Sequence, residues 1–313
     1  MQTVIRTMTL HIETPLVESR QLSLSSGRSI WLKLDALQPP GSFKIRGIGF
    51  ACEDHAKRGA RRFVSSSGGN AGLAVAYAGR MLKIPVIVVV PKSTSGRTQD
   101  RLRLENAEVI EHGPSWQEAN EFALSLVGAA DAFIHPFNDH LLWEGHATIV
   151  DEIVRSRLKP DAVVLSVGGG GLLSGVAEGL HRNGWGHIPI LAVETEMTAS
   201  FHEATKVGHP VELTEVKGCA KSLGAKRVCD KSVQWWKERP IQSILVSDRS
   251  ALSACERFLD DHRLLVEPAC GASLALAYDR ALELEPFSTV LVIVCGGATA
   301  TIDEIREWSQ KCV

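Results

Sequence analysis

The chain has 313 residues, of which 44% are hydrophobic and 22% are charged, values that are ordinary for a soluble globular protein and argue against wholesale disorder. Its 34 Lys and Arg residues against 36 Asp and Glu residues give a formal net charge of −2, so no global field attracts nucleic acid or an anionic membrane. The length favours one large domain or two modest ones.

Short β-branched runs alternate with amphipathic stretches along most of the chain. Four runs are apolar on both faces, as in parallel strands covered by helices, and all are far shorter than the roughly 20 residues of a membrane span. These runs are 86–90, 162–167, 190–194 and 290–294. The stretches with helical periodicity are 70–82, 97–106, 172–181, 250–262 and 269–284. The alternation predicts an α/β fold of parallel strands joined by helices.

The N-terminus and the cysteines indicate the compartment. The first 16 residues lack a continuous apolar core and a small-residue cleavage site, so we expect no signal peptide. The cysteines are odd in number and scattered, which indicates reduced thiols in the cytoplasm rather than a disulfide framework. They are Cys52, Cys219, Cys229, Cys255, Cys270, Cys295 and Cys312.

The first of three glycine-rich segments is Ser65–Gly72, which follows an extended run and precedes a helical stretch. Glycine lets a ligand approach the backbone closely, and serine hydroxyls with the amides of a helix start can hold a carboxylate or a phosphate. The alternative interpretation is a tight turn in which Asn70 caps the helix.

The second segment contains four consecutive glycines, Gly168–Gly171, and the third is Cys295–Ala298. Four glycines are entropically costly in a simple connection, and their N–H groups can form a nest for a phosphate dianion. The spacing is neither GxGxxG nor a Walker A sequence, and a flexible hinge is the alternative. Because ligands in open α/β sheets bind at the carboxyl ends of strands, we expect the three segments to converge at one sheet end.

Lys44 lies among small and apolar residues in the segment Gly41–Gly47. In such a context the amine loses its proton more easily, and a neutral amine is what forms a Schiff base. Taken alone, one lysine among many is more often an exposed charge.

Other catalytic patterns are incomplete or absent. His140, His146 and His202 lie near glutamates but lack the HExxH spacing, so we interpret them as surface or capping histidines. The sequence has no CxxC pair for a structural zinc and no GxSxG motif of a hydrolase.

Taken together and in order, several of these segments resemble the fold type II pyridoxal-phosphate enzymes, and within them the L-serine dehydratase/L-threonine deaminase family. The blocks that carry the resemblance are 42–44, 67–72, 135–139, 143–146, 168–172, 266–272 and 294–297. The resemblance implies a two-domain, tryptophan-synthase-β-like α/β fold with mostly parallel sheets flanked by helices. Residues 1–40 and 142–313 would form a large cofactor-binding domain, and 41–141 a small domain.

The resemblance also implies roles around the cofactor, pyridoxal 5′-phosphate. Lys44 would hold the cofactor as a Schiff base and later act as the base at the substrate Cα. Asn70 would bond the ring oxygen O3′, Phe43 would pack on one ring face, and Cys295 would face the pyridine nitrogen. Backbone N–H groups would bind the phosphate from Gly168, Gly169, Gly170, Gly171 and Leu172.

For the substrate, the resemblance assigns Ser67 and the amides of Gly68 and Gly69 to the amino-acid carboxylate. Gly68 stands where related racemases carry a serine, and glycine has no side-chain proton to donate, so we expect elimination without appreciable racemisation. Ala298 replaces a serine and Ser222 a small apolar residue of the family pattern, and either departure could reshape the substrate pocket.

The family also binds a monovalent cation such as K⁺, mostly through backbone carbonyls. The matching positions here are Gly168, Glu194, Thr198, Ser200, Leu223 and Ala225. Thr198 departs from the alanine expected at its position.

The implied activity is the loss of water from L-serine, and also L-threonine, to give pyruvate or 2-oxobutanoate plus ammonia. We expect a cytoplasmic homodimer without a feedback regulatory domain, acting on a small amino acid and not on nucleic acid or membranes. The alternatives are serine racemase or β-replacement activity, a non-catalytic ligand-binding homologue, and a nicotinamide oxidoreductase. Lys44 argues against the idle homologue, and the missing GxGxxG spacing argues against the oxidoreductase.

Overall fold

The computed structural model describes residues 9–311, in which strands alternate with helices. The strands are β1 (Leu16–Glu18), β2 (Ser29–Lys33), β3 (Arg62–Ser65), β4 (Val86–Val90), β5 (Glu108–Glu111), β6 (Asp131–Phe133), β7 (Ala162–Ser166), β8 (Ile190–Thr195), β9 (Ile241–Val246) and β10 (Thr289–Ile293). The α-helices are α1 (Arg20–Ser26), α2 (Lys44–Lys57), α3 (Asn70–Leu82), α4 (Gly96–Leu104), α5 (Trp116–Ser125), α6 (His140–Arg155), α7 (Gly171–Arg182), α8 (Ser200–Val207), α9 (Asp230–Glu238), α10 (Asp248–His262), α11 (Pro268–Tyr278) and α12 (Ile302–Lys311). Short 3₁₀ helices are η1 (Asp35–Leu37), η2 (Glu196–Thr198), η3 (Lys221–Leu223) and η4 (Leu282–Leu284).

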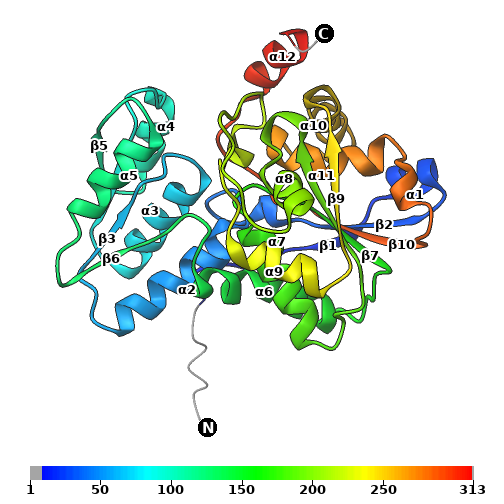
Figure 1. The fold of residues 1–313 in the computed structure, drawn as a ribbon, viewed down its shortest axis with the longest axis horizontal. Helices are drawn as coiled ribbons and strands as arrows, with labels where there is room; N and C mark the ends of the chain where they lie inside the picture. Colours follow the sequence, from blue (N-terminus) through cyan, green and yellow to red (C-terminus); the bar gives the residue numbers. More distant parts are fainter. Residues whose placement is uncertain (1–8, 312–313) are drawn as a thin grey trace.

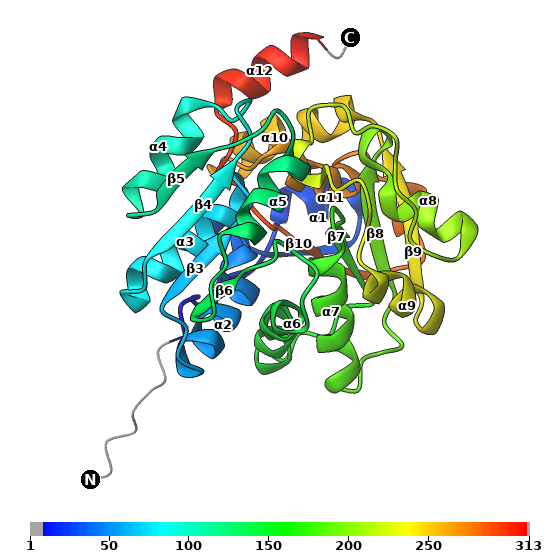
Figure 2. The ribbon, with the colours of Figure 1, turned by 60° about the vertical axis from the view of Figure 1, so that its left-hand side comes forward.

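The strands form two open sheets, which are the cores of two neighbouring lobes (Figures 1 and 2). One sheet has six strands in the order β1-β2-β10-β7-β8-β9, and the other has four in the order β5-β4-β3-β6. Every neighbouring pair is parallel except β1 with β2. The expected α/β class, with mostly parallel sheets flanked by helices, is confirmed.

The apolar runs predicted as strands are interior strands of the two sheets. They are β4, β7, β8 and β10, and all residues of β4 are buried. The helical stretches also match, except that the predicted helix 269–284 ends at Tyr278. The next two residues, Asp279 and Arg280, emerge into solvent, and Arg280 takes a φ of 52° that a helix cannot continue through. The chain then forms the separate turn η4.

The four-stranded sheet is formed entirely by the segment between Arg62 and Phe133, and α2 to α5 lie in the same lobe (Figure 1). The range 41–141 that we predicted for a small domain includes this sheet, and the six-stranded sheet lies in 1–40 and 142–313. The domain limits themselves stay a prediction. Helix α2 packs against both α3 and α6, so it lies at the junction of the lobes.

A buried network of charged side chains ties the first turn of α2 to the six-stranded sheet. Arg46 lies between two carboxylates, with its Nε 2.7 Å from Asp35 Oδ2 and its Nη1 2.5 Å from Glu152 Oε1. Lys33 on β2 reaches the same Glu152 at 2.5 Å. All four side chains are at most 4% exposed. Two cations and two anions balance, so removing one member would leave a buried charge without its partner.

Two further observations concern the expected compartment. Within residues 9–311, no helix has both the length and the apolar character that crossing a membrane requires. The six cysteines of the same range are buried and form no disulfide. Cys312 and the first eight residues of the segment in which we expect no signal peptide lie outside the described residues.

We predict that Arg46→Met lowers the free energy of unfolding by about 3–5 kcal/mol, because Asp35 and Glu152 would stay buried without their cation. The control is Arg58→Met, which breaks the exposed pair between Arg58 and Asp54 and should cost less than about 1 kcal/mol. Urea denaturation of both variants measures the difference, and equal losses would contradict the prediction.

Candidate active site

The three glycine-rich segments each begin at the carboxyl end of a parallel strand, as predicted. The expectation that they meet at one sheet end is wrong, because the first segment follows β3 of the four-stranded sheet, whereas the others follow β7 and β10 of the six-stranded sheet. They meet between the sheets through intermediate side chains. Gly69 lies beside Thr299, Thr299 Oγ1 is 3.5 Å from Ser222 Oγ, and Gly168 lies against the backbone of Ser222.

The loop before α2 is joined to the third glycine-rich segment by backbone hydrogen bonds. Phe43 donates its N–H to Cys295 O at 3.0 Å, and Gly297 donates its N–H to Gly41 O at 2.9 Å. This pairing places Lys44, the first residue of α2, beside the carboxyl end of β10.

The Lys44 amine has few polar neighbours. Its Nζ donates a hydrogen bond to Pro136 O at 2.6 Å and lies 5.3 Å from the centre of the Phe43 ring. Burial lowers the pKa of Lys44 to about 8, against the opposing effect of Cys295 and Glu267. A substantial fraction of this amine is therefore neutral near physiological pH, which is the state that attacks a carbonyl carbon.

The four glycines lead into α7, whose first N–H groups have no partner within the helix. Gly170 has a φ of 86°, in the left-handed region that favours glycine. The ring of Phe137 lies so close to Gly169 that a side chain there would overlap it. Four small residues at a helix N-terminus form a site suited to a phosphate group.

Asn70 does not cap its helix, so that alternative interpretation is wrong. Gly69 is the capping residue, and the Asn70 side chain instead has two hydrogen-bond partners across the junction. Its Nδ2 donates to Glu267 Oε1 at 2.7 Å, and its Oδ1 accepts the N–H of Ala298 at 2.9 Å. The side chain therefore joins the first glycine-rich segment to the six-stranded lobe.

Sequence reasoning assigned no role to Glu267, although the segment 266–272 contributed to the resemblance. The side chain is buried and accepts hydrogen bonds from Asn70, Thr299 and Ser222. Burial raises the pKa of the carboxyl group, and these donors act in the opposite direction. One feature of the sequence could have indicated Glu267: a charged residue stands directly before Pro268, where an apolar helix begins.

His146 was predicted to be a surface or capping residue, and this is wrong. The ring is fully buried, because its face of α6 packs against α2 and α7. It lies 4.9 Å from the Phe43 ring, and its Nδ1 accepts the N–H of Gly47 at 3.2 Å. Burial holds the pKa of His146 well below its usual value, so the ring is neutral and supports Phe43 without adding charge.

Ser67, Gly68 and Gly69 are only partly buried, which leaves their hydroxyl and amides reachable. The Cys295 thiol is buried, and a hydrogen bond with Cys270 together with burial holds its pKa well above the usual value. The predicted partner of the ring nitrogen is therefore a neutral thiol.

The residues expected to bind a cation lie in two groups, one at Gly168 and η3 and the other at the end of β8 and just after it. Gly168 lies against Leu223, and Ala225 donates its N–H to Leu223 O at 2.8 Å. Thr198 is the last residue of η2, two residues before α8 begins at Ser200. Its hydroxyl forms a hydrogen bond with the hydroxyl of Thr195.

The second group contains Glu194 and Ser200. The Glu194 carboxylate accepts the N–H groups of Phe201 and His202 at 2.8 and 2.7 Å, and burial raises its pKa to about 8. Ser200 Oγ is buried without a hydrogen-bond partner. In residues 9–311, no cluster of three or more His, Cys, Asp or Glu side chains could hold a metal, so apart from Glu194 the predicted ligands of a cation here are backbone and hydroxyl oxygens.

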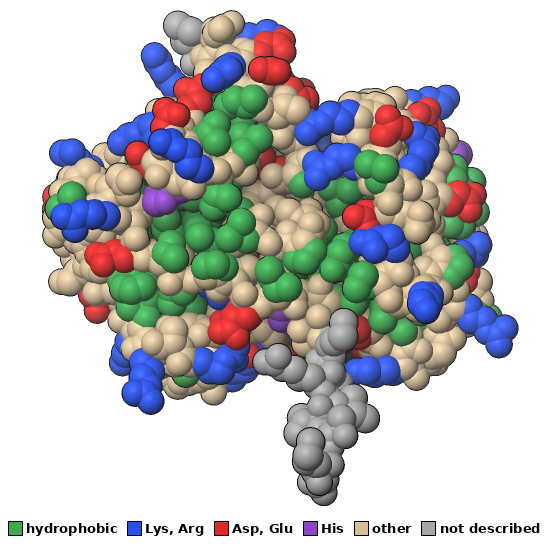
Figure 3. Space-filling view, turned by 180° about the vertical axis from the view of Figure 1, so that it is seen from behind, with side chains coloured by type: hydrophobic (Ala, Val, Ile, Leu, Met, Phe, Trp, Pro, Cys, Tyr) green, Lys and Arg blue, Asp and Glu red, His purple; other side chains and the backbone are tan. Residues whose placement is uncertain are grey.

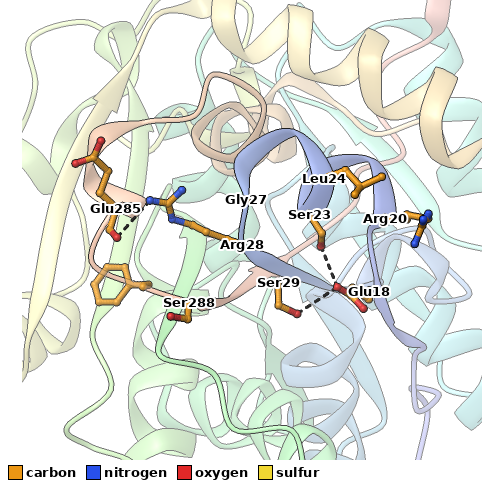
Figure 4. A pocket seen from close by; sticks show the side chains of 10 residues that line it. Glu18, Arg20, Ser23, Leu24, Gly27, Arg28, Ser29, Glu285 and Ser288 are labelled. Carbon is orange, nitrogen blue, oxygen red and sulfur yellow. Dashed lines mark hydrogen bonds between the residues drawn. The ribbon is translucent and has the colours of Figure 1, made fainter.

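A separate cavity of about 500 Å³ lies at the other end of the six-stranded sheet, near the amino ends of β2 and β10 (Figure 4). Its lining includes Glu18, Arg28 and Glu285, and Arg28 already donates to the backbone carbonyls of Leu284 and Ser26. None of the predicted site residues contributes to it.

Comparisons with known proteins identify the family and the fold. Residues 8–296 match the family described as pyridoxal-phosphate dependent enzyme. The chain is 46% identical to the human L-serine dehydratase/L-threonine deaminase, over 96% of this chain and 95% of that protein. It is 43% identical to the L-serine dehydratase of Dictyostelium discoideum, over 96% and 92%. A fungal L-serine ammonia-lyase from Rhizomucor miehei has a TM-score of 0.93 at 34% identity, over 98% of this chain and all of that one.

We predict that the Lys44 amine of the ligand-free protein reacts with formaldehyde and borohydride with a midpoint near pH 8, because its neutral form appears as the pH rises through that pKa. Lys57, exposed at the other end of α2, is the control. Mass spectrometry of methylated peptides measures both residues, and a shared midpoint would contradict the prediction.

Proposed function

The chain belongs to the pyridoxal-phosphate dependent enzyme family, and on that premise we propose that it is a lyase that deaminates L-serine, and also L-threonine, by β-elimination. Relatives named L-serine dehydratase/L-threonine deaminase and L-serine ammonia-lyase, matched over nearly the whole chain, support this activity. The likeness of the whole fold confirms the expected fold type II architecture. The observation that carries the proposal is the half-buried amine of Lys44, with a pKa of about 8, at the junction of the glycine-rich segments.

The residues at the junction fit pyridoxal phosphate. The N–H groups at the start of α7 suit its phosphate, and the Lys44 amine suits its aldehyde carbon. Asn70 retains one Nδ2 hydrogen for the ring oxygen, Phe43 offers an aromatic face, and Cys295 offers a neutral thiol to the ring nitrogen. When bound, the cofactor supplies an electron-withdrawing ring that stabilises negative charge at the substrate Cα.

The remaining chemistry falls to side chains of this chain. The Ser67 hydroxyl and the amides of Gly68 and Gly69 bind the substrate carboxylate, which holds Cα within reach of Lys44. The Lys44 amine takes the proton from Cα, and the β-hydroxyl leaves as water. Hydrolysis then replaces the amino group with oxygen, so L-serine gives pyruvate and ammonia with all atoms balanced. A neutral thiol at Cys295 stabilises a charged ring nitrogen less than a carboxylate would, which favours prompt elimination.

A monovalent cation, K⁺ by family resemblance, would bind beside the tetraglycine segment. The unpartnered buried hydroxyl of Ser200 supports this, since a buried polar atom without a partner is unfavourable unless a ligand fills the site. The other ligands would come from Gly168, Glu194, Thr198, Leu223 and Ala225.

We predict that K⁺ raises the turnover rate relative to tetramethylammonium, and that Ser200→Ala raises the half-saturating K⁺ concentration up to about tenfold.

Homodimerisation and a cytoplasmic location also stay proposals that rest on the resemblance. Hydrophobic side chains gather between charged ones on the rear face of the molecule (Figure 3), which supports a subunit interface.

We predict that the purified protein with pyridoxal phosphate converts L-serine to pyruvate and ammonia, and that Lys44→Ala reduces this rate at least about 1,000-fold because both the attachment point and the base are lost. Lys57→Ala, on the exposed end of the same helix, is the control and should keep the wild-type rate. Pyruvate is measured by coupled NADH oxidation. Pyruvate formation by Lys44→Ala at the wild-type rate would show that this assignment is wrong.

We predict that the wild-type enzyme forms pyruvate without accumulating D-serine, and that Gly68→Ser introduces some racemisation. Gly68 offers no proton donor, whereas a serine hydroxyl could protonate Cα from the face opposite Lys44. A side chain at position 68 would lie 3.1 Å from both Val90 and Thr94, so the change requires only a small shift of these neighbours. Chiral chromatography of residual serine measures it, and D-serine formed by the wild type as fast as pyruvate would contradict the account.

A further inference from the structure

Glu267 is a buried carboxylate that none of the steps above uses. It precedes α11 and could cap that helix, yet its side chain makes no capping hydrogen bond. The carboxylate instead points to the junction of the lobes, where Oε1 accepts from Asn70 and Oε2 from Thr299. Because burying a carboxylate away from water is unfavourable, its burial at the junction needs an explanation.

The backbone around Glu267 leaves room for this orientation. Gly297 has a φ of 134°, a conformation open to glycine, and any side chain there would overlap the side chain of Glu267. The glycine turn after β10 therefore leaves space for the buried carboxylate, and it also forms the hydrogen bond to the loop that carries Lys44.

The two hydrogen bonds of Asn70 determine which way its amide faces. An asparagine amide has an accepting oxygen and a donating nitrogen of nearly the same shape, and only its partners decide which atom occupies which place. Ala298 N–H requires the oxygen, and the Glu267 carboxylate requires the nitrogen. One Nδ2 hydrogen remains for a further acceptor.

We propose that Glu267 is a positioning residue that holds the Asn70 amide in one orientation across the junction, so that its Nδ2 donates to the ring oxygen of the bound cofactor. Without Glu267, the Ala298 N–H alone would hold the amide, and the side chain would turn more easily and present its oxygen to another oxygen. This inference rests on the proposed function, because it gives Asn70 its role there.

Other groups face the same carboxylate. Lys44 and Arg101 lie within electrostatic range of Glu267, and neither donates a hydrogen bond to it within the described chain. The direct contacts of the carboxylate are Asn70, Thr299 and Ser222. A role through Asn70 is therefore separable from a role through charge, because glutamine keeps an accepting oxygen for Asn70 and removes the charge.

The experiment compares three substitutions in the holoenzyme. In Glu267→Ala and Glu267→Asp the side chain is too short to contact Asn70. Aspartate leaves a smaller cavity than alanine. We expect both to shift the visible absorption band of bound pyridoxal phosphate without substrate, and to lower kcat about tenfold or more with little change in KM, because Asn70 faces the cofactor and not the substrate. Glu267→Gln keeps an oxygen that accepts from Asn70, while its NH₂ group can donate to the Thr299 hydroxyl but not pair with the Thr299 N–H, so it should recover part of the band position and of kcat.

A double-mutant cycle tests whether Glu267 acts through Asn70. In an Asn70→Ala background, Glu267→Asp should change neither the band nor kcat further. Glu304→Gln is the control, because Glu304 also bridges the lobes, through Arg97, but makes no contact with Asn70. Its band and kcat should match the wild type.

Three results would overturn the inference alone: full additivity in the cycle, a Glu267→Gln variant as impaired as Glu267→Ala, or a Glu267→Asp variant with wild-type band and kcat. A wild-type protein that shows no visible band with pyridoxal phosphate would overturn the proposed function as well.

Discussion

The position of the first turn of α2 is the constraint on which the site depends. Arg46 is buried two residues after Lys44 and is held by Asp35 and Glu152, so the helix cannot rotate or slide without separating buried charges. The hydrogen bond from Phe43 N–H to Cys295 O fixes the preceding residue against the end of β10. Lys44 lies between these two restraints, and its amine therefore occupies one place relative to the three glycine-rich segments.

This placement also determines the charge of the reactive groups. Lys44 is partly buried next to a neutral histidine and a neutral thiol, and burial brings its pKa down to about 8. Glu267 is the carboxylate that opposes this shift, and its oxygens are occupied by Asn70 and Thr299. The site thus keeps an amine that readily loses its proton, while a nearby negative charge is used to orient an amide.

The sequence alone predicted the parts of the structure that depend on local pattern. Runs of β-branched residues became interior strands, and the segments at Ser67–Gly72 and Gly168–Gly171 lie at strand ends because glycine permits close approach there. The family resemblance then supplied the roles of individual residues, which periodicity could not. The division into two sheets was not readable from local pattern, because strand pairing depends on contacts between distant segments, and only the resemblance implied it.

The partners of Asn70 and the burial of His146 could not be predicted for the same reason. The partners of Asn70 are 197 and 228 residues away, and nothing near it in the sequence signals them. His146 is buried only because three helices meet around it.

The most direct test of the account is to find the residue that holds the cofactor. The holoenzyme is reduced with borohydride, digested, and analysed by mass spectrometry for the peptide that carries the reduced phosphopyridoxyl group. We expect a single modified lysine, Lys44, and recovery of the unmodified peptide when reduction is omitted. A phosphopyridoxyl group on any other lysine, or on none, would contradict it.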